Sequence, residues 1–398
     1  MSTRWNVVVI GGGYAGVMAA NRLTRRADVD VTLINPRPQF VERIRLHQLL
    51  SQTHTPTHDF AGLLADRVHL VVDSVTEIDA DARRISLAGG GDLAYDYLVY
   101  AVGSTSAGAP VPGAAEHAEH VGSLEETQRL RTALAALPTG APVAVVGGGP
   151  TGIETAAELA ETGRAVTLLC GADLGPSLHP QARHWLSRRL HRLGVQVLEG
   201  AGSRAVQVTA DEVHLADGRS IRSSLTVQAA GFDLPDLAAR SGLSTDEAGR
   251  LRTDETLTSI DDPHIVAAGD AGAPSDRPVR MSCQAAVQLG RQAAETVLRR
   301  IAGQAPRPVG VAFVALCLSV GRRAGLLQVT RRNDAALPVH LRGRAGVVAK
   351  ELICSGTVLQ LRFEARHPGR VDGWMTDPVR TRTLQSTEHT AQETGPDR

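Results

Sequence analysis

The chain has 398 residues, of which 42% are hydrophobic and 21% charged, and its 42 basic residues balance 42 acidic ones. At roughly 100–200 residues per domain this length predicts two or three domains, and the apolar content excludes a globally disordered chain. A formal net charge of zero argues against nucleic acid or an anionic membrane surface as the main partner.

The amino-terminal part of the chain is typical of one βαβ unit followed by further strands. A short apolar strand leads into a glycine-rich turn, the turn opens a helix, and a second apolar strand follows. Because the first strand starts near Asn6, no room is expected for a signal peptide. The predicted elements are strand 7–10, turn 11–16, helix 15–26, strand 29–34, antiparallel strands within 69–87 and a buried strand at 97–102.

The same pattern restarts in the middle of the chain. Its glycine turn begins at Gly147, as the first began at Gly11. An internal repeat of this kind indicates two domains of the same type. The predicted elements are strand 143–146, turn 147–152, helix 153–161, strand 165–169, helix 180–193, and strands at 195–198, 205–208, 212–215 and 225–229.

The remaining third of the chain begins with a long amphipathic helix predicted at 281–301, and two prolines then mark a linker. Residues 311–374 alternate predicted strands and turns, and Lys350 is expected in a strand-like stretch in which its side chain faces either solvent or the acceptor side of the site. The longest apolar run, 311–320, is about half of what a membrane-spanning helix needs. From residue 376 the sequence is polar and lacks hydrophobic periodicity, which predicts disorder.

These elements predict an α/β fold with two Rossmann-like, three-layer ββα/βαβ dinucleotide-binding domains and a small C-terminal α+β module. The first domain is expected to be discontinuous. The predicted bounds are 1–115 with 255–305 for the first domain, 116–254 for the second, 306–375 for the C-terminal module and 376–398 for a disordered tail.

Each glycine turn matches the spacing of a phosphate-binding loop, with a strand before it and a helix after it. The first glycine permits the tight turn, the second lets a pyrophosphate approach the backbone, and the third lets helix and strand pack closely. The helix N-terminus then offers free N–H groups and a positive dipole to the phosphates. The alternative is two glycine-rich turns that bind no nucleotide. The glycines are Gly11, Gly13 and Gly16 in the first copy and Gly147, Gly149 and Gly152 in the second.

The end of the second strand of such a unit normally carries an acid for a ribose hydroxyl. The corresponding positions here are Asn35 and Cys170. Asn35 retains the ability to donate to and accept from a hydroxyl, whereas Cys170 leaves the choice between NADH and NADPH open. A degenerate second site without a nucleotide stays an alternative.

The ordered motifs resemble those of the flavoproteins with two dinucleotide-binding domains. The resemblance covers roughly residues 5–300 and implies FAD in the first domain and NADH or NADPH in the second. The stretch 265–271 (IVAAGDA) resembles the second FAD motif, in which Asp270 would bind the ribityl chain. The cofactor-binding residues so implied are Gly11, Gly13, Tyr14, Ala15, Gly16, Asn35, Arg43, Ala101, Gly103, Gly269 and Asp270 for FAD, and Gly147, Gly149, Gly152 and Cys170 for NAD(P)H.

Within that superfamily the chain resembles the type II NADH:quinone oxidoreductases and their soluble relatives. Its four cysteines form no CxxC or CxxxxC pair, so electrons are expected to leave the flavin directly, and no metal site is expected. The stretch 282–288 (SCQAAVQ) is similar to the family's quinone-site motif. The resemblance implies that Gln284 and Gln288, which share one helix face, contact a carbonyl acceptor. The alternative is that both face solvent.

Two further residues are catalytic candidates. Glu154 matches a family carboxylate near the nicotinamide, although an ordinary first-turn acid is the alternative. His47 lies in the segment that passes over the flavin ring in relatives, and is either an acid–base group, a flavin attachment point or a structural histidine. Glu158 and Glu161 are expected to face solvent or a domain interface.

The sequence therefore predicts an FAD-dependent NAD(P)H oxidoreductase that passes electrons to a quinone-like or aromatic small molecule. One alternative is a soluble tailoring flavoenzyme of the oxidase, dehydrogenase or monooxygenase type, with a degenerate NAD(P)H site. Another is a flavin-binding redox sensor. Because residues 366–398 contain few large apolar residues, we expect a cytoplasmic protein without stable membrane insertion, and a homodimer is compatible with the sequence.

Overall fold

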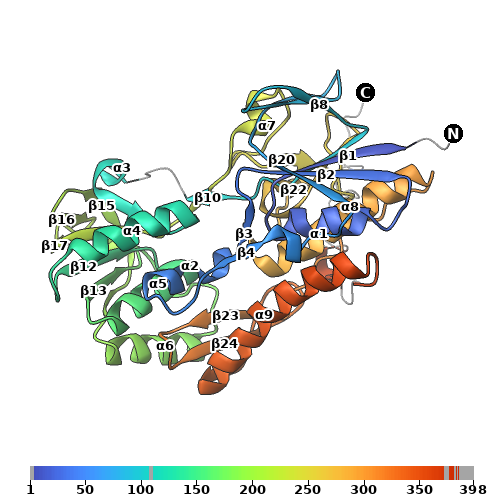
Figure 1. Cartoon of the computed structure of the whole chain (residues 1–398). Coiled ribbons are helices and arrows are strands. Elements are labelled where there is room, and N and C mark those ends of the chain that lie inside the picture. The colour runs from blue at the N-terminus through green and yellow to red at the C-terminus, as the bar shows by residue number, and fades with distance from the viewer. Residues whose placement is uncertain (1–3, 107–110, 372–375, 381, 383, 385–398) are drawn as a thin grey trace, which may run out of the picture.

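The structure is a computed structural model that describes residues 4–106, 111–371, 376–380, 382 and 384. Three of the sheets, each covered by helices, form the centres of the two domains and of the C-terminal module (Figure 1). The first two are the parallel sheets of two Rossmann-like domains, as the glycine repeat predicts.

The first sheet has five parallel strands in the order β21-β9-β1-β2-β5. Alternate residues of β1 enter different cores: Val7 and Val9 pack with helices α1 and α8, whereas Val8 and Ile10 pack with the antiparallel sheet β6-β7-β8. This two-sided burial produces three layers and explains why residues 7–10 of the strand are all apolar. The strands are β1 (Trp5–Ile10), β2 (Val29–Asn35), β5 (Val68–Val72), β9 (Tyr97–Tyr100), β21 (Ile265–Ala267), β6 (Val75–Asp79), β7 (Arg84–Leu87) and β8 (Asp92–Ala94), and the helices are α1 (Tyr14–Leu23) and α8 (Cys283–Ile301).

Strand β21 pairs with β9, although the whole second domain lies between them in the sequence. The first domain is therefore discontinuous. The sheets mark the centres of the domains and not their limits, so the bounds given above stay a prediction.

The second sheet repeats the first, in the parallel order β11-β18-β12-β13-β14. One face packs on α4, α5 and α6, and the other on the antiparallel sheet β15-β16-β17. The strands are β11 (Ala118–His120), β12 (Pro142–Val146), β13 (Ala165–Leu169), β14 (Gln196–Leu198), β18 (Leu225–Gln228), β15 (Ala205–Val208), β16 (Glu212–Leu215) and β17 (Ser220–Arg222), and the helices are α4 (Leu124–Ala136), α5 (Pro150–Glu161) and α6 (Pro180–Arg192).

The C-terminal module consists of an antiparallel sheet, β23-β24-β25, crossed by the 23-residue helix α9. The expectation of strands and turns up to residue 374 is therefore wrong for α9. Its β-branched residues suggested a strand, but its buried positions recur every three or four residues, as packing of one helix face requires. The elements are β23 (Ala315–Ser319), β24 (Gly325–Thr330), β25 (Ala336–Gly343) and α9 (Arg344–Arg366).

Short elements complete the fold. A turn of helix, α2 (Leu46–Leu50), follows the 3-10 helix η1 (Arg43–Arg45) and leads from the first domain to α5. The others are β3 (Gln39–Val41), β4 (Thr57–Asp59), η2 (Phe60–Gly62), β10 (Thr105–Ser106), α3 (Ala114–His117), η3 (Ala201–Ser203), β19 (Phe232–Asp233), α7 (Leu237–Arg240), β20 (Leu251–Thr253), η4 (Gly269–Ala271) and β22 (Gly272–Pro274).

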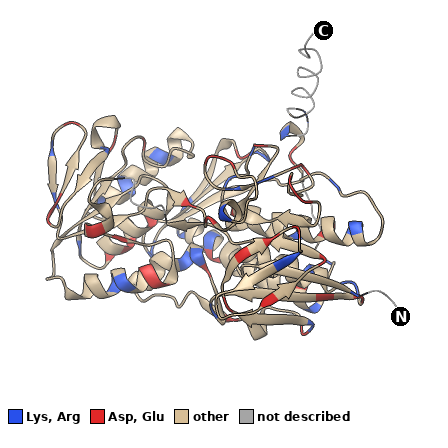
Figure 2. Ribbon diagram, turned by 90° about the horizontal axis from the view of Figure 1, so that it is seen from above, with Lys and Arg blue, Asp and Glu red and all other residues tan. Residues whose placement is uncertain are grey.

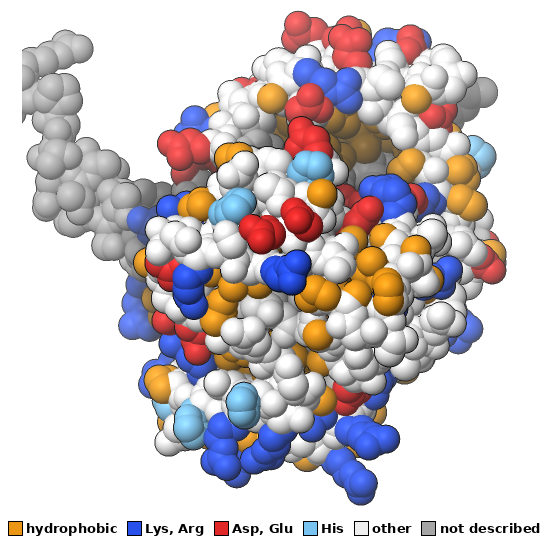
Figure 3. All heavy atoms as spheres, turned by 90° about the vertical axis from the view of Figure 1, so that its left-hand side faces the viewer, with side chains coloured by type: hydrophobic (Ala, Val, Ile, Leu, Met, Phe, Trp, Pro, Cys, Tyr) orange, Lys and Arg blue, Asp and Glu red, His pale blue; other side chains and the backbone are white. Residues whose placement is uncertain are grey.

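Acidic and basic residues are interspersed along the elements, as the balanced composition suggests (Figure 2). The face seen in Figure 3 likewise carries both signs of charge and is hollowed near its top. Within the part of the chain that the structure describes, none of the helices combines the length and the hydropathy that crossing a bilayer demands. Arg380 forms an ion pair with Glu255, so the start of the predicted disordered tail is structured, whereas residues 381, 383 and 385–398 lie outside the described residues.

Candidate active site

The two glycine turns have nearly the same geometry. Gly11 has φ +102°, and a Cβ there would lie 2.3 Å from the carbonyl oxygen of Ala101. At Gly16 an added Cβ would lie 1.8 Å from the carbonyl oxygen of Gly11, and at Gly152 it would lie 1.9 Å from that of Gly147. These positions therefore need glycine, because any side chain would strain the backbone or separate helix from strand.

The middle glycines differ, because they face open space. A Cβ on Gly13 or Gly149 would meet no atom within 4 Å. Each is the N-cap of its helix, α1 or α5, and neither cap uses a side chain to satisfy the first backbone N–H groups. Free donors, an open cradle and a helix dipole together fit a pyrophosphate. Both loops therefore fit the dinucleotides that the sequence motifs imply.

Asn35 and Cys170 occupy equivalent places at the ends of β2 and β13. The Asn35 side chain supports the loop itself, since its Oδ1 accepts from the Gly12 N–H at 2.9 Å and its Nδ2 donates to the Arg37 carbonyl. Cys170 lies against Gly148, and burial, followed by nearby Glu199 and Asp173, raises the pKa of its thiol to about 12. Cys170 is thus a neutral thiol where a ribose-binding acid is usual.

Asp270, Ser104 and Arg43 form a polar cluster at the carboxyl edge of the first sheet. The Ser104 hydroxyl donates to Asp270 Oδ2 at 2.8 Å, and Arg43 donates to the Ser104 carbonyl at 2.7 Å. Burial raises the pKa of Asp270, while the Ser104 hydrogen bond and Arg43 oppose that shift. Gly269 brings this edge against α1, since a Cβ there would lie 2.9 Å from Ala15 Cβ. Ala101 lies against Gly11 of the first glycine loop, and Gly103 directly precedes Ser104.

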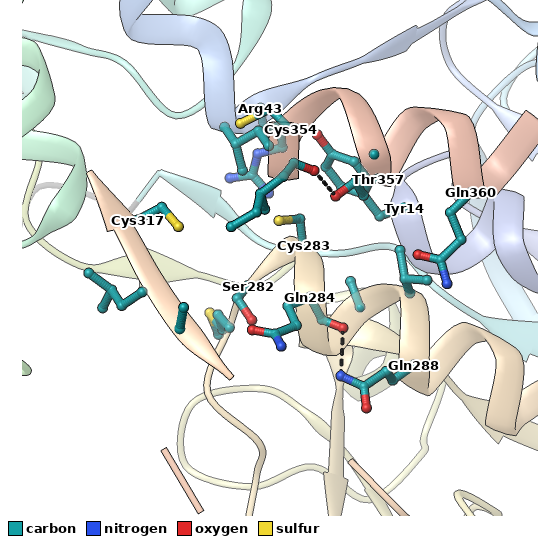
Figure 4. Close-up of a pocket in the computed structure, with 18 of the residues that line it drawn as sticks. Tyr14, Arg43, Ser282, Cys283, Gln284, Gln288, Cys317, Cys354, Thr357 and Gln360 are labelled. Atoms are coloured by element: carbon teal, nitrogen blue, oxygen red, sulfur yellow. Dashed lines mark hydrogen bonds between the residues drawn. The ribbon is translucent and has the colours of Figure 1, made fainter. Parts of the chain in front are cut away.

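One cavity of about 1480 Å³ joins these parts of the molecule. Its lining includes Asp270 and Arg43 from the first domain and Pro150, Thr151 and Glu154 from the start of α5. Figure 4 shows a further wall in which α8 presents Cys283 and Gln284 and α9 presents Cys354 and Gln360. The cavity thus connects both dinucleotide-binding domains with the C-terminal module.

Lys350, Glu154 and His47 meet in a buried cluster on this cavity. The Lys350 amino group donates to Glu154 Oε1, which also accepts from the Ser319 N–H at 2.7 Å. His47 Nδ1 lies 3.4 Å from Glu154 Oε2, and His47 Nε2 is buried with no partner among the described residues. Burial, followed by Lys350, holds the pKa of His47 well below its usual value, so the imidazole is neutral.

Lys350 is predicted in a strand-like stretch, which is wrong, and the sequence leaves open whether its side chain faces the acceptor side. It is not exposed in a strand but 4% exposed in α9, facing the cavity. The sequence feature that singles it out is that Lys350 is the only lysine among the 42 lysine and arginine residues of the chain. Its buried position follows from its carboxylate partner, which offsets the desolvation of the ammonium group.

Gln284 and Gln288 both line the cavity, but only one has a free side chain. Gln288 Nε2 donates to the Ala312 carbonyl at 3.0 Å and to the Gln284 carbonyl, and its Oε1 accepts from the Ala312 N–H. Gln288 therefore fastens the backbone at Ala312. The Gln284 amide, four residues away on the same face of α8, stays directed at the cavity (Figure 4).

The two other acids of α5 have structural contacts. Glu158 is buried, accepts from the Ser51 hydroxyl at 2.6 Å, and has a raised pKa, mainly because of burial. Glu161 accepts from the Arg322 N–H at 2.6 Å. Both therefore lie at interfaces between α5 and neighbouring segments.

The comparisons with known proteins agree with this arrangement. The family described as pyridine nucleotide-disulphide oxidoreductase matches residues 5–290. An NADH dehydrogenase-like protein of Mycobacterium tuberculosis is 32% identical over 347 residues, which are 79% of this chain and 85% of that protein. The type II NADH:quinone oxidoreductase of the same organism is 27% identical over 76% of this chain and 74% of its own length. The structure of NDH2 from Plasmodium falciparum in complex with NADH superposes with a TM-score of 0.76 at 16% identity, covering 92% of this chain and 99% of that one.

Proposed function

We propose that this chain, which belongs to the pyridine nucleotide-disulphide oxidoreductase family, passes electrons from NAD(P)H to a quinone-like or aromatic small molecule. The dependence on FAD and NAD(P)H follows from the family and from its NADH dehydrogenase-like relatives. The acceptor and the residues that serve it are the proposal.

The observation that carries the proposal is the single cavity shared by three parts of the chain. Asp270 and the first glycine loop would hold FAD, and the second loop would hold NAD(P)H. Bound FAD supplies the two-electron chemistry that links a nicotinamide to an acceptor. The wall built by β23 and α9 belongs to neither cradle, so we assign it to the acceptor.

The acceptor wall is largely apolar. Leu316, Cys317, Ile353 and Cys354 line it around the ammonium group of Lys350, and Arg362 and Arg366 line it further along α9. Burial raises the pKa of Cys317 and of Cys354 to about 12, so both thiols are neutral. Such a wall accommodates an aromatic ring, with the positive charge of Lys350 nearby to favour electron density that builds up on the acceptor.

Reduction of a quinone also requires protons, and the buried cluster is suited to deliver them. His47 Nδ1 lies 3.4 Å from Glu154 Oε2, and its Nε2 is buried without a partner among the described residues. Glu154 links that imidazole to Lys350. We assign to these three residues the holding and passing of protons on the acceptor side.

The proposed path of the electrons includes no disulfide. All four cysteines are free thiols within the described residues, although the family's name refers to disulphide substrates. No disulfide among the described residues can therefore carry electrons from the flavin to the acceptor. Since both glycine loops present the same open cradle, the geometry gives no support to a degenerate second site.

Anaerobic mixing of the purified flavoprotein with NADH and, separately, NADPH tests the first half of the reaction. Prompt loss of the oxidised flavin band is expected with at least one of them. Addition of a short-chain benzoquinone should then restore the band and sustain turnover. If neither nucleotide bleaches the flavin, or if the quinone leaves it reduced, the proposal is wrong.

A further inference from the structure

Tyr14 follows Gly13 in the first glycine loop and is the first residue of α1, and its hydroxyl is unpaired among the described residues. The ring packs edge-on against Phe40, with centroids 5.0 Å apart and planes at 88°. The residue is only 8% exposed, and the Oη atom is buried with no hydrogen-bond partner among the described residues. Because a buried hydroxyl is normally paired, this one points to a group that the protein binds.

The hydroxyl lies in the acceptor part of the cavity. Tyr14 lines the cavity together with Cys283 at the start of α8 and Cys354 and Thr357 of α9 (Figure 4). Cys354 is one helical turn from Lys350, so both lie on the same face of α9. The phenol therefore reaches from the FAD-binding domain toward the wall that the C-terminal module contributes.

The neighbouring polar groups on this wall are already paired. The Thr357 hydroxyl donates to the Ile353 carbonyl at 2.9 Å. The Ser282 hydroxyl accepts from the Ala285 N–H and caps α8. The Gln288 amide is held by the backbone of Ala312 on both sides. Tyr14 is thus the buried hydroxyl of this region that stays available to a ligand.

The phenol is suited to donate a hydrogen bond. Burial, followed by the nearby Cys283 and Glu42, raises the pKa of Tyr14 well above its usual value. The group therefore keeps its proton throughout the pH range in which the enzyme would work. A protonated phenol in an apolar cavity is a good partner for a carbonyl oxygen.

We propose that the Tyr14 hydroxyl donates a hydrogen bond to a carbonyl oxygen of the acceptor, and so selects carbonyl-bearing acceptors over those without such an oxygen. This role goes beyond the cofactor contact expected for Tyr14 from its place in the motif. It rests on the proposed function, because it presupposes that the α9 wall receives the acceptor.

The test is Tyr14→Phe, which keeps the ring on Phe40 and removes only the hydroxyl. With saturating NAD(P)H, kcat/KM for a short-chain benzoquinone should fall about threefold to tenfold, as expected for one neutral hydrogen bond. With ferricyanide, which has no carbonyl oxygen, kcat/KM should stay at the wild-type value. Both rates are expressed per bound flavin, so that any effect on the FAD contact expected for Tyr14 is separated from the loss of the hydrogen bond to the acceptor.

Tyr95→Phe is the matched control, because Tyr95 also has a buried, unpartnered hydroxyl but does not line the cavity. It should leave both acceptor reactions unchanged. An unchanged benzoquinone reaction per bound flavin in Tyr14→Phe, or an equal fall with ferricyanide, would each overturn the inference. Tyr14→Phe is expected to fold, because it keeps the ring on Phe40 and removes only a hydroxyl that has no partner among the described residues. Failure of the wild-type flavin to bleach would instead refute the proposed function.

Discussion

The amino group of Lys350 in α9 forms a buried ion pair with the carboxylate of Glu154 in α5, although the two residues are 196 positions apart. The side chain of Lys350 is 5% exposed and that of Glu154 is 10% exposed. The pair therefore ties the C-terminal module to the NAD(P)H-binding domain beside the cavity. Such a pair stabilises little by itself, but either charge alone would be costly to bury.

The first prediction concerns the loss of one partner. Lys350→Met should lower the free energy of unfolding by about 3–5 kcal/mol, because it leaves the Glu154 carboxylate buried without its cation. Lys350→Met combined with Glu154→Gln should recover most of that loss. Urea denaturation of the two single variants and the double variant measures the coupling.

The control for this comparison of single and double variants is Arg344→Met, which removes an exposed cation from the start of the same helix. It should change the unfolding free energy by no more than about 0.5 kcal/mol. Strictly additive effects of Lys350→Met and Glu154→Gln would show that the two charges do not interact as the structure indicates.

The sequence predicts the two parallel sheets well, because their signals are local. The strand, glycine turn, helix and second strand of each unit lie within about 30 residues, and each step has its own steric or hydrophobic cause. The open cradles at Gly13 and Gly149 and the crowded sites at Gly16 and Gly152 follow from that spacing alone.

The acceptor wall could not be predicted in the same way. The Lys350–Glu154 pair depends on how the C-terminal module packs against α5, and no local pattern encodes that packing. The β-branched residues of α9 favour a strand by propensity, yet burial of one helix face decides its structure. The attachment of Gln288 to Ala312 likewise requires a loop 24 positions away.

The second prediction is a pH dependence that originates at His47. Its pKa in the folded protein lies well below 6.5, chiefly because of burial, so the unfolded chain binds the proton more readily. Stability should therefore fall as the pH drops through the unfolded pKa. From about pH 7.5 to about pH 5.5, one such histidine accounts for about 1.4 kcal/mol. His47→Gln should remove that share of the acid loss measured by urea denaturation.

His69→Gln provides the comparison, since His69 is an exposed residue of β5. This variant should retain the acid sensitivity of the wild type. The same sensitivity in His47→Gln would contradict a neutral, buried imidazole.

The third prediction separates the two dinucleotide sites. At Gly13 and Gly149 the backbone is in an ordinary extended conformation and the Cβ direction is open, so a large side chain fits the protein but fills the phosphate cradle. Gly149→Trp should retain FAD and lose reduction by NAD(P)H by at least about a hundredfold, since the pyrophosphate contact is excluded. Gly13→Trp should be isolated without flavin. Absorbance spectra and anaerobic reduction distinguish these outcomes, and loss of FAD in Gly149→Trp would contradict the assignment of the sites.

The fourth prediction distinguishes the two glutamines of α8, which the resemblance places together at the acceptor. Gln288→Ala should lower the unfolding free energy by about 1–3 kcal/mol, because it leaves the buried N–H and carbonyl of Ala312 without their partner. Gln284→Ala should change stability by no more than about 0.5 kcal/mol, yet lower kcat/KM for a benzoquinone about threefold to tenfold, because its amide is free to contact the acceptor. Urea denaturation and steady-state kinetics on both variants measure the difference. A Gln288→Ala protein of wild-type stability would show that the backbone at Ala312 does not depend on this side chain. Equal effects of Gln284→Ala and Gln288→Ala on kcat/KM would show that Gln284 has no separate role at the acceptor.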